Sequence, residues 1–388
     1  MTPSHWPASC APAEAMARPT LLVAGLSVRQ LAQASAREGF TTLALDAFGD
    51  RDTRHAAPRW RAWHRFDAGD LLDALHEAAA SGALGWIAGS GFEAHLDLLA
   101  AGALRLPLLG TPVDGWRLVR DPRRFFPLLQ ALGLPHPPTR WDQPPADHQD
   151  WLFKDGAACG GWHVRPARDV EAPGGLGCWQ RRLDGVPMSA AFVADGCRAL
   201  CLGFNEQLVG LPDAPYAWRG AIGPVPVPSD VAAQIDTALQ QLIPACGLRG
   251  LGSLDFLLGA DGGVSLLELN PRPGGTLQLY APQSPLRLHL RACLGAPLPT
   301  QPVSQTVSGL EVLYAPRRLR LQAAELQRLA RRAWVHDLPD APVDVAAREP
   351  VCSLSATAPD AEAVRALLRR RHDELTPLLE NCAHELPC

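Results

Sequence analysis

The sequence predicts a protein of α/β and α+β class, with a parallel sheet first and mainly antiparallel strands after it. Three observations indicate this order. Apolar runs that end in glycine alternate with helical spacing near the N-terminus, strand-like pieces and a tight hairpin turn follow, and short strands with one long amphipathic helix come last. We therefore expect a disordered tail and three domains, with boundaries at 1–17, 18–113, 114–300 and 301–388.

The first domain begins with "PTLLVAG", an apolar run ending in glycine that predicts a strand. A segment with helical spacing, "SVRQLAQASAREGF", and a second apolar run, "TTLALDAF", complete a βαβ unit. The alternation continues through "DLLDALHEAAASG", "ALGWIAGSG" and "FEAHLDLLAAGA". The glycines of "GSGFE" do not form a dinucleotide fingerprint, because the third glycine and an acidic partner are missing. We expect a Rossmann-like parallel sheet without that motif.

The middle of the chain opens with a short helix, "RRFFPLLQAL", which ends at Gly133 before prolines that favour an extended exit. Strand-like pieces come next: "DWLFKDG", "GCWQRRL", "MSAAFVADG" and "CRALCLGFNEQLV". A long helix, "SDVAAQIDTALQQLIPACG", precedes a hairpin. The last part has short strands, "SGLEVLYAP" and "EPVCSLSATA", and an amphipathic helix, "DAEAVRALLRRRHDELTPLLE", which together predict a small α+β domain.

The composition excludes several classes of function. The formal net charge of −4 and the scattered arginines give no electrostatic basis for binding nucleic acid. No run reaches the roughly 18 apolar residues of a membrane helix, and the N-terminus lacks the pattern of a secretion signal. The 10 cysteines include no CxxC pair, so we expect most of them to be buried thiols in a reducing cytoplasm. The sequence leaves the oligomeric state open, with a homodimer among the options.

The hairpin "SLDFLLGADGGVSLLELNPRPGG" carries the strongest chemical signal. Side chains alternate along a strand, so Glu268 and Asn270 point to the same face. Folding the hairpin about Asp261 places Asp255 opposite Glu268 on that face. Three oxygen ligands on two rigid strands suit Mg²⁺, and "NPRPGG" then directs Arg272 toward an anionic group. The alternative is that the acidic residues only line the wet face of an edge hairpin.

One residue stands out from the composition. Lys154, in "WLFKDGAACGGWHV", is the only lysine in a chain that otherwise uses arginine. An ammonium on a flexible stem is a compact charge that follows phosphate oxygens, whereas a planar guanidinium needs a wider slot. A lysine kept just before a glycine pair therefore indicates a phosphate contact. The alternative is a stray lysine under a strong compositional bias.

In these segments the chain resembles the ATP-grasp superfamily of carboxylate–amine ligases, over residues 114–282. "LLELNPRPGG" resembles its metal-binding signature, "WLFKDGAACGGWHV" its lysine strand and glycine-rich flap, and "CWQRRLDGVPMSAAFVADG" its adenine-reading strand and hinge. The resemblance implies an ATP-grasp fold preceded by the Rossmann-like domain. The texture is most similar to a branch of predicted carboligases, some of which accompany genes for one-carbon metabolism with methanopterin-type or methylofuran-type cofactors. An amino-acid or glutamate ligase in cofactor biosynthesis is what that branch implies.

Carried over residue by residue, the resemblance implies a complete site for ATP and one or two Mg²⁺ ions. Lys154 contacts the α- and β-phosphates, and the backbones of Gly160 and Gly161 approach the β- and γ-phosphates. Arg272 steadies the transferring phosphoryl group or the acceptor carboxylate. The implied metal ligands are the three oxygen donors of the hairpin, Asp255, Glu268 and Asn270.

The adenine side of the resemblance includes departures from the family pattern. Gln180 stands where the hinge commonly starts with glutamate, and its amide oxygen still accepts from the adenine amine. The backbone of Arg182 or Leu183 pairs with the ring. Many members have a lysine after an aspartate before the first helix, where "RDPRR" offers Arg123 instead, and Pro187 stands where an acidic residue often holds the ribose.

The family chemistry implies that a carboxylate attacks the γ-phosphate to give an acyl phosphate and ADP, and that an amine then displaces phosphate. Acceptor candidates are Ser27 and Arg29 after the first strand, Ser90 and Glu93 after "WIAG", and Arg219 in "PYAWRGAIGPVP" as a carboxylate clamp. For the first four, loop polarity and helix capping are the alternative. Two other interpretations are a kinase-like or carboxylase-like enzyme, for which no carrier lysine remains, and a nucleotide-binding regulator without turnover.

Overall fold

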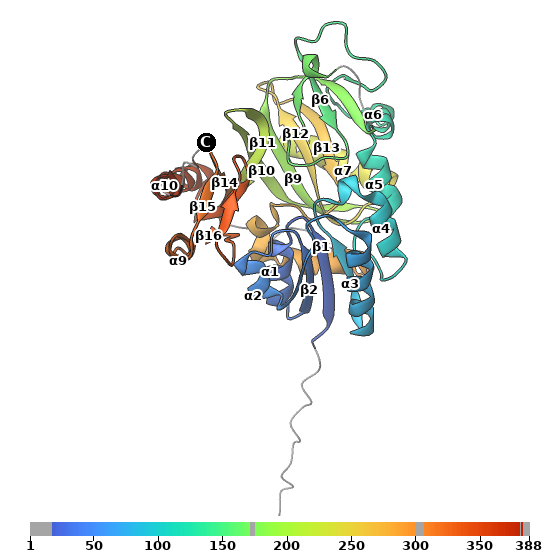
Figure 1. Cartoon of the computed structure of the whole chain (residues 1–388). Coiled ribbons are helices and arrows are strands. Elements are labelled where there is room, and N and C mark those ends of the chain that lie inside the picture. The colour runs from blue at the N-terminus through green and yellow to red at the C-terminus, as the bar shows by residue number, and fades with distance from the viewer. Residues whose placement is uncertain (1–17, 171–174, 300–305, 381, 383–388) are drawn as a thin grey trace, which may run out of the picture.

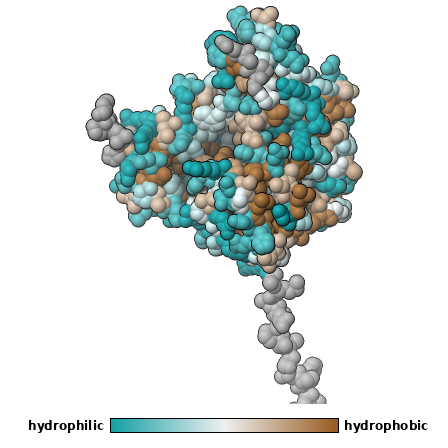
Figure 2. Space-filling view, turned by 45° about the vertical axis from the view of Figure 1, so that its right-hand side comes forward, coloured by the Kyte–Doolittle hydropathy of each residue, from teal (hydrophilic) through white to brown (hydrophobic). Residues whose placement is uncertain are grey.

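The structure is a computed structural model that describes residues 18–170, 175–299 and 306–380, together with residue 382. The predicted tail, residues 1–17, lies outside the described residues. Figure 1 shows a parallel sheet below a large antiparallel sheet, with the C-terminal strands and helices to one side. No described helix is long and apolar enough to cross a membrane. Both hydrophilic and hydrophobic residues lie on the face drawn in Figure 2.

The N-terminal sheet is parallel, as the βαβ pattern predicted, with the strand order β3-β2-β1-β4. Its strands are β1 (Thr20–Gly25), β2 (Thr41–Asp46), β3 (Arg59–Ala62) and β4 (Ala83–Ala88). The helices beside them are α1 (Arg29–Arg37), α2 (Arg51–Ala56), α3 (Ala68–Ala80) and α4 (Leu96–Ala103), with the 3-10 turn η1 (Phe92–Ala94). Leu21 and Val23 pack with α1, whereas Leu22 and Ala24 pack with α3 and α4. Strand β1 is buried throughout because helices cover both of its faces.

The strand order creates a switch point at the carboxyl ends of β1 and β4. The chain continues from β1 to β2 on one side, and β4 lies on the other side. The loops that leave these two ends are adjacent, and the Leu26 N–H donates to the Ser90 carbonyl oxygen over 2.7 Å. Exposed Ser27 and half-buried Ser90 lie in these loops. In open α/β sheets, ligands bind in the crevice at such a point.

Helices α5 (Val113–Arg120) and α6 (Pro122–Ala131) lead into a small antiparallel sheet of order β5-β8-β6-β7. Its strands are β5 (Thr139–Arg140), β6 (Trp151–Asp155), β7 (Arg165–Pro166) and β8 (Gly177–Arg181), with the 3-10 turn η2 (Ala167–Asp169). The Asp121 side chain caps α6 by accepting from the Arg123 N–H. The strand before the glycine-rich loop, β6, pairs directly with β8 before the hinge.

An eight-stranded antiparallel sheet forms the centre of the molecule, with the order β13-β12-β9-β10-β11-β14-β18-β16. Its strands are β9 (Val186–Asp195), β10 (Ala199–Leu211), β11 (Ala214–Val225), β12 (Arg249–Leu258), β13 (Val264–Asn270), β14 (Val307–Tyr314), β16 (Val335–His336) and β18 (Pro350–Ala358). Helices α7 (Ser229–Cys246) and α10 (Ala361–Glu380) cover one face. The turn η3 (Leu277–Gln283) and helix α8 (Pro285–Cys293) cover the other, together with α1. The remaining elements are β15 (Leu319–Leu321), α9 (Ala323–Ala330) and β17 (Val343–Val345).

The central sheet continues across the predicted boundary near residue 300. Strand β14 pairs with β11, which places Glu311 beside Gly220, and β18 pairs with β14. Strands of the C-terminal segment therefore extend the sheet that the middle of the chain begins. The domain boundaries themselves remain predictions.

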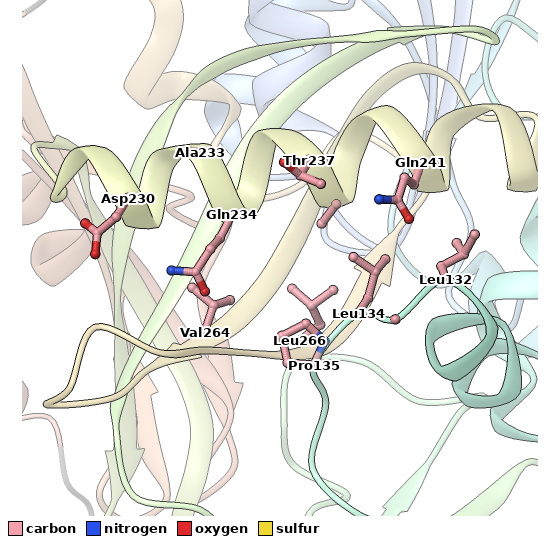
Figure 3. Close-up of a pocket in the computed structure, with 12 residues that line it drawn as sticks. Leu132, Leu134, Pro135, Asp230, Ala233, Gln234, Thr237, Gln241, Val264 and Leu266 are labelled. Carbon is pink, nitrogen blue, oxygen red and sulfur yellow. The ribbon is translucent and has the colours of Figure 1, made fainter.

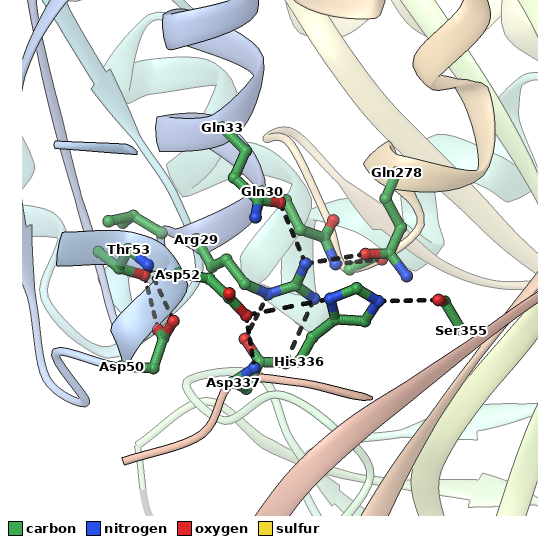
Figure 4. Close-up of polar contacts among 12 residues, drawn as sticks. Arg29, Gln30, Gln33, Asp50, Asp52, Thr53, Gln278, His336, Asp337 and Ser355 are labelled. Carbon is green, nitrogen blue, oxygen red and sulfur yellow. Dashed lines mark hydrogen bonds and ion pairs between the residues drawn. The ribbon is translucent and has the colours of Figure 1, made fainter. Parts of the chain in front are cut away.

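A polar cluster ties the N-terminal sheet to the C-terminal segment (Figure 4). Arg29, the first residue of α1, is 2% exposed and binds both carboxylate oxygens of Asp337. It also donates to Gln278 over 3.1 Å, and the Asp337 N–H donates to Asp52 over 3.0 Å. Arg29, an acceptor candidate on sequence grounds, is therefore engaged by side chains of two other segments, η3 and the C-terminal segment.

Candidate active site

The predicted register of the metal hairpin is confirmed. Asp255 lies opposite Glu268, and Ser253 lies opposite Asn270. The Asn270 side-chain amide donates to Asp255 over 3.2 Å, so their polar ends meet on one face. The register shifts after Asp255, where Phe256 pairs with Leu266, and this bulge sends Leu266 and Leu269 together into the core beneath α7.

The charges of the two hairpin carboxylates are unequal. Burial and, next, the charge of Glu268 raise the pKa of Asp255 to about 7. Burial also acts to raise the pKa of Glu268, but the Arg120 guanidinium outweighs it and holds that pKa below its ordinary value. A cation bound between the two carboxylates would favour the charged form of Asp255, because an opposite charge nearby lowers the pKa of a carboxyl group.

The donor set fits Mg²⁺. Carboxylate and amide oxygens are hard ligands, and Mg²⁺ commonly takes one or two carboxylates and fills its other positions with water and phosphate oxygens. Within the described part of the chain, no group of three or more His, Cys, Asp or Glu side chains is arranged to hold a metal ion. A cation here would therefore depend on Asp255, Glu268 and the Asn270 oxygen, with the nucleotide completing the shell.

Lys154 projects from β6 toward these carboxylates. Its Nζ donates to Gln180 Oε1 over 2.6 Å, and Gln180 Nε2 donates in turn to Thr139 over 3.1 Å. Burial lowers the pKa of Lys154, while the charges of Glu268 and Asp255 act in the opposite direction. Gln180 is 2% exposed and orients the lysine in this structure. Its contact with the adenine amine remains a prediction.

The hinge residues Arg182 and Leu183 follow β8. The Arg182 N–H donates to the Asp150 carbonyl oxygen over 2.7 Å, and its side chain lies 3.7 Å from the carboxylates of Asp150 and Asp184. The Arg182 N–H is therefore committed to the chain itself. The predicted pairing of the adenine ring with this hinge remains a prediction for its other backbone groups, including those of Leu183.

The glycine-rich loop after β6 rests on β11. Gly160 and Gly161 have φ angles of +73° and +74°, which L side chains rarely adopt. The Gly160 carbonyl oxygen accepts from the Trp218 N–H over 2.9 Å, and a Cβ on Gly161 would lie 2.0 Å from the Tyr216 oxygen. The glycine pair thus allows the loop to approach the strand closely. Its predicted contact with phosphates remains a prediction.

The end of this loop packs against the C-terminal segment. The Trp162 ring lies 5.1 Å from the Tyr314 ring in an edge-on arrangement, and the Trp162 side chain is still 40% exposed. Burial lowers the pKa of His163, and its Nδ1 is buried with no hydrogen-bond partner among the described residues. The loop is seated in this structure, and its predicted role as a mobile flap remains a prediction.

Arg120 is the site residue that the sequence reasoning missed. It closes α5, is 4% exposed, and its guanidinium binds Glu268 and two carbonyl oxygens at the start of the glycine-rich loop. Arg123, the predicted phosphate contact, is exposed and donates to the Gly175 oxygen over 3.0 Å. A usable signal was present, because Arg120 follows Trp116 by one helical turn on a face that is buried.

Arg272 points toward the N-terminal sheet. Its Nε and Nη2 lie 2.6 and 2.5 Å from Glu93 Oε1, and the Gly91 N–H donates to Glu93 Oε2 over 2.6 Å. The side chains are 10% and 1% exposed. Burial acts to raise the pKa of Glu93, but Arg272 and Arg120 outweigh it and hold that pKa below its ordinary value. Glu93 therefore brings the switch-point loop after β4 to the metal hairpin.

Arg219, the predicted carboxylate clamp, is engaged by an internal carboxylate. It lies at a register shift in β11, and its Nη1 donates to Glu311 of β14 over 2.6 Å. His372 of α10 lies 3.5 Å from the same Glu311 oxygen. Arg219 Nε is buried with no hydrogen-bond partner among the described residues. A substrate role for Arg219 remains a prediction.

A pocket of about 440 Å³ lies on the other side of the hairpin from these groups (Figure 3). Val264 and Leu266 of β13, Leu134 after α6, and Gln234 and Thr237 of α7 contribute to its walls. Because Leu266 belongs to the core beneath α7, this pocket is separate from the candidate active site.

Comparisons with known proteins agree with this geometry. Residues 119–276 match the family described as an ATP-grasp domain. Over 182 residues the chain is 27% identical to a D-alanine–D-alanine ligase of Oleidesulfovibrio alaskensis, in an alignment that covers 42% of this chain and 56% of that relative. The chain thus spans about half the length of this curated relative.

Solved structures share the fold over nearly the whole chain. Biotin carboxylase from Campylobacter jejuni has a TM-score of 0.71 at 15% identity, covering 93% of this chain and 92% of that chain. L-amino acid ligase from Bacillus licheniformis has a TM-score of 0.67 at 16% identity, covering 92% of this chain and 98% of that chain. The predicted ATP-grasp fold is confirmed.

Proposed function

Because residues 119–276 of this chain belong to the ATP-grasp family, we propose that the protein is an ATP- and Mg²⁺-dependent, ADP-forming carboxylate–amine ligase. A small-molecule carboxylate attacks the γ-phosphorus of ATP, and ADP leaves from the acyl phosphate that forms. An amine then attacks the acyl carbon, phosphate leaves, and an amide-type bond remains. The observation that carries the proposal is the set of Asp255, Glu268 and Asn270 on paired strands that face Lys154.

The charged side chains suit phosphoryl transfer, in which catalysis consists largely of positioning and charge stabilisation. Mg²⁺ held by the hairpin oxygens would neutralise charge on the β- and γ-phosphate oxygens. Lys154 supplies a cation whose direction Gln180 fixes. Arg272 uses Nε and Nη2 for Glu93, whereas its Nη1 makes only a 3.5 Å contact with the Pro273 oxygen. That nitrogen is the part of Arg272 that we assign to an anionic substrate.

The glycine-rich loop is proposed to exclude water from the acyl phosphate. The position of the loop supports this role, because the Gly160 carbonyl oxygen accepts from the Trp218 N–H and Trp162 packs on Tyr314. An acyl phosphate hydrolyses unless water is kept away from it, and loop closure is a common solution. Limited trypsin digestion of the protein with and without MgATP would measure this, and equal cleavage near the loop in both states would contradict it.

The carboxylate and amine are proposed to bind between the metal hairpin and the switch point of the N-terminal sheet. Ser27 and Ser90 lie in the two loops of that crevice, and Glu93 joins the second loop to Arg272. Amino acids, including glutamate, and small cofactor precursors have the carboxylate and amine groups that this chemistry requires. We place the reaction in the cytoplasm.

The experiment that tests the proposal is a screen for ADP release with purified protein, ATP and Mg²⁺. The acceptors are amino acids, short γ-glutamyl compounds and precursors of pterin and furan cofactors, each supplied as a carboxylate with and without an amine. We expect ADP and phosphate in equal amounts only when a matching pair is present. ATP binding without turnover over the whole panel would instead favour a regulator.

A carboxylase-like enzyme is the second candidate, favoured by the likeness in fold to biotin carboxylase over 93% of this chain. Bicarbonate would then take the place of the organic carboxylate. The only lysine of the chain, Lys154, lies in the candidate site and is not free to serve as a carrier. ADP release that requires bicarbonate, without an organic carboxylate, would select this candidate.

A further inference from the structure

The strongest feature without an assigned role is the buried guanidinium of Arg120. We propose that Arg120 is a positioning residue that clamps the base of the glycine-rich loop to Glu268, so that loop order and cation binding depend on one side chain. The proposal rests on the proposed function only for the identity of the ligand that the loop covers. The clamp itself can be tested without nucleotide.

Each nitrogen of the guanidinium has a different partner. Nε donates to the Gly156 carbonyl oxygen over 2.8 Å, Nη2 donates to the Ala158 carbonyl oxygen over 2.7 Å, and Nη1 binds Glu268 Oε1. A planar fork with fixed N–H directions can serve three acceptors at once, whereas an ammonium offers a single nitrogen. The partners therefore specify arginine at this position.

The backbone around the clamp is fitted to this contact. A Cβ on Gly156 would lie 2.4 Å from the Arg120 carbonyl oxygen, so only glycine allows the end of α5 to approach the loop this closely. The Arg120 side chain is 3% exposed, and two carbonyl oxygens of the loop turn toward it. Removing the guanidinium would leave these two carbonyl oxygens, on half-buried residues, without their donors, which favours opening of the loop.

The contact with Glu268 links the loop to the metal hairpin. Arg120 binds Oε1 of Glu268, whose side chain is 38% exposed, so the carboxylate is accessible to solvent. Holding one oxygen fixes the orientation of this carboxylate on the strand pair that it shares with Asp255 and Asn270. A side chain that sets this orientation would raise the affinity for a divalent cation without touching the nucleotide.

The clamp differs from a phosphate contact in a way that can be measured. An arginine that binds phosphate has free nitrogens when nucleotide is absent, whereas each guanidinium nitrogen of Arg120 already has a protein partner, in the loop or at Glu268. Arg117 provides the matched control, because it lies three residues away on the same helix, is exposed, and donates to Asp114 over 3.3 Å. Arg120→Ala, Arg120→Lys and Arg117→Ala therefore form one series.

The first measurement is amide hydrogen exchange of residues 156–164 in the nucleotide-free protein. We expect exchange about tenfold faster in Arg120→Ala and Arg120→Lys, because local opening is governed by the hydrogen bonds that close the segment. Arg117→Ala should exchange as the wild type does, and α7 should be unchanged in all three. If Arg120→Ala does not fold, Arg120→Lys, which keeps the charge and most of the volume, decides the question.

The second measurement is the Mg²⁺ dependence of binding of a fluorescent ATP analogue. In Arg120→Ala we expect the Mg²⁺ concentration at half-maximal binding to rise about tenfold, with partial recovery on adding guanidinium chloride at a non-denaturing concentration. Unchanged loop exchange in both Arg120 variants, or equal effects in Arg117→Ala, would overturn the clamp. Loss of loop protection in a protein that binds no ATP would keep the clamp and reject the proposed function.

Discussion

Two buried arginines of this molecule, Arg120 and Arg29, have similar exposure and different surroundings. Each guanidinium forms an ion pair with a carboxylate, Arg120 with Glu268 and Arg29 with Asp337. Each arginine is at most 4% exposed. The other partners of Arg29 are the side chains of Gln33 and Gln278, whereas those of Arg120 are carbonyl oxygens of a loop. The same ion pair therefore joins packed elements in one place and holds a loop at a chemical site in the other.

The comparison teaches that burial and pairing alone do not identify a catalytic region. The Arg29 cluster contains Asp50, whose pKa is raised to about 6 by burial and then by the charge of Asp337. A perturbed pKa in a charged cluster suggests a functional site only with some probability. The Arg120 region differs because its carboxylates lie beside Lys154 of β6, on the side of the hairpin away from the core beneath α7.

The largest expected effect is a loss of turnover when the carboxylate partner of Arg120 is changed. Glu268→Gln should reduce turnover by about 10²–10³-fold, because it removes a charge placed to stabilise the transferring group. Its melting temperature should fall less than that of Arg29→Ala, because the amide oxygen of the variant can still accept from Arg120 and only the charge of the buried pair is lost. Steady-state ADP release and a thermal melt measure both quantities.

Asp261→Asn is the control for Glu268→Gln, because Asp261 belongs to the same hairpin but accepts only from the Gly263 N–H in the turn. It should keep wild-type turnover. Full activity of Glu268→Gln would remove the metal assignment from the hairpin.

The second effect is on stability. Arg29→Ala should lower the free energy of unfolding by about 3 kcal/mol, since it leaves Asp337 without its partner in a buried cluster. Urea unfolding measures it. Turnover per folded molecule should stay near wild type, which is the reverse of the pattern for Glu268→Gln.

The pair Arg29→Met with Asp337→Leu sharpens this prediction, because replacing both members of a buried pair is often neutral. The double variant should recover most of the stability. A double variant as unstable as Arg29→Ala would mean that the loss comes from the contacts of Arg29 with Gln33 and Gln278.

The third effect is a dependence of stability on pH, and it comes from a buried histidine that links α8 to two other segments. His289 of α8 accepts from the Leu251 N–H over 2.8 Å at Nδ1, and its Nε2 lies 2.9 Å from the Leu109 oxygen. Burial lowers the pKa of His289 to about 4. Below the unfolded value of about 6.5 the unfolded chain binds a proton that the folded chain excludes, so stability falls as pH decreases from about 6.5 to 4.

Between pH 7 and pH 5 this one group should cost about 2 kcal/mol of stability. Asp50 acts in the opposite direction, because its raised pKa makes the folded chain bind more protons as pH decreases below about 6. The measurement is therefore the difference in urea unfolding between wild type and His289→Gln at both pH values. A difference that does not change with pH would contradict the assignment.

The smallest effect tests the shape of the phosphate slot. Lys154→Arg should weaken ATP binding by about tenfold, because a guanidinium cannot occupy the space in which Nζ lies 2.6 Å from Gln180. Titration with a fluorescent ATP analogue measures it, with Arg117→Lys as the control for a basic exchange outside the slot. Normal affinity in Lys154→Arg would show that Lys154 does not set this slot.

Much of the fold was predictable because its signals are local. The alternation of apolar runs and helical spacing predicted the parallel sheet, and the turn at Asp261 set the register that brings Asp255 opposite Glu268. Lys154 was identified because the composition makes a lysine exceptional. In each case the information lies within one segment of the chain.

The contacts that could not be predicted from the sequence join distant segments of the chain. Arg219 and Glu311 are paired because β14 joins β11, and nothing near either residue indicates that strand pairing. Arg120 is recognised only when α5 lies against the glycine-rich loop. Glu93 was predicted as an acceptor candidate, and its ion pair with Arg272 requires the N-terminal sheet to meet the hairpin.

The central claim is that the hairpin of β12 and β13 holds a divalent cation beside a nucleotide that Lys154 contacts. A crystal structure of the full chain with Mn²⁺ and a non-hydrolysable ATP analogue tests it directly through the anomalous signal of the metal. The account predicts a peak bound by Asp255, Glu268 and the Asn270 oxygen, with phosphate oxygens in its shell and Lys154 Nζ beside the phosphates. A nucleotide bound elsewhere, or a peak that these three residues do not touch, would contradict it.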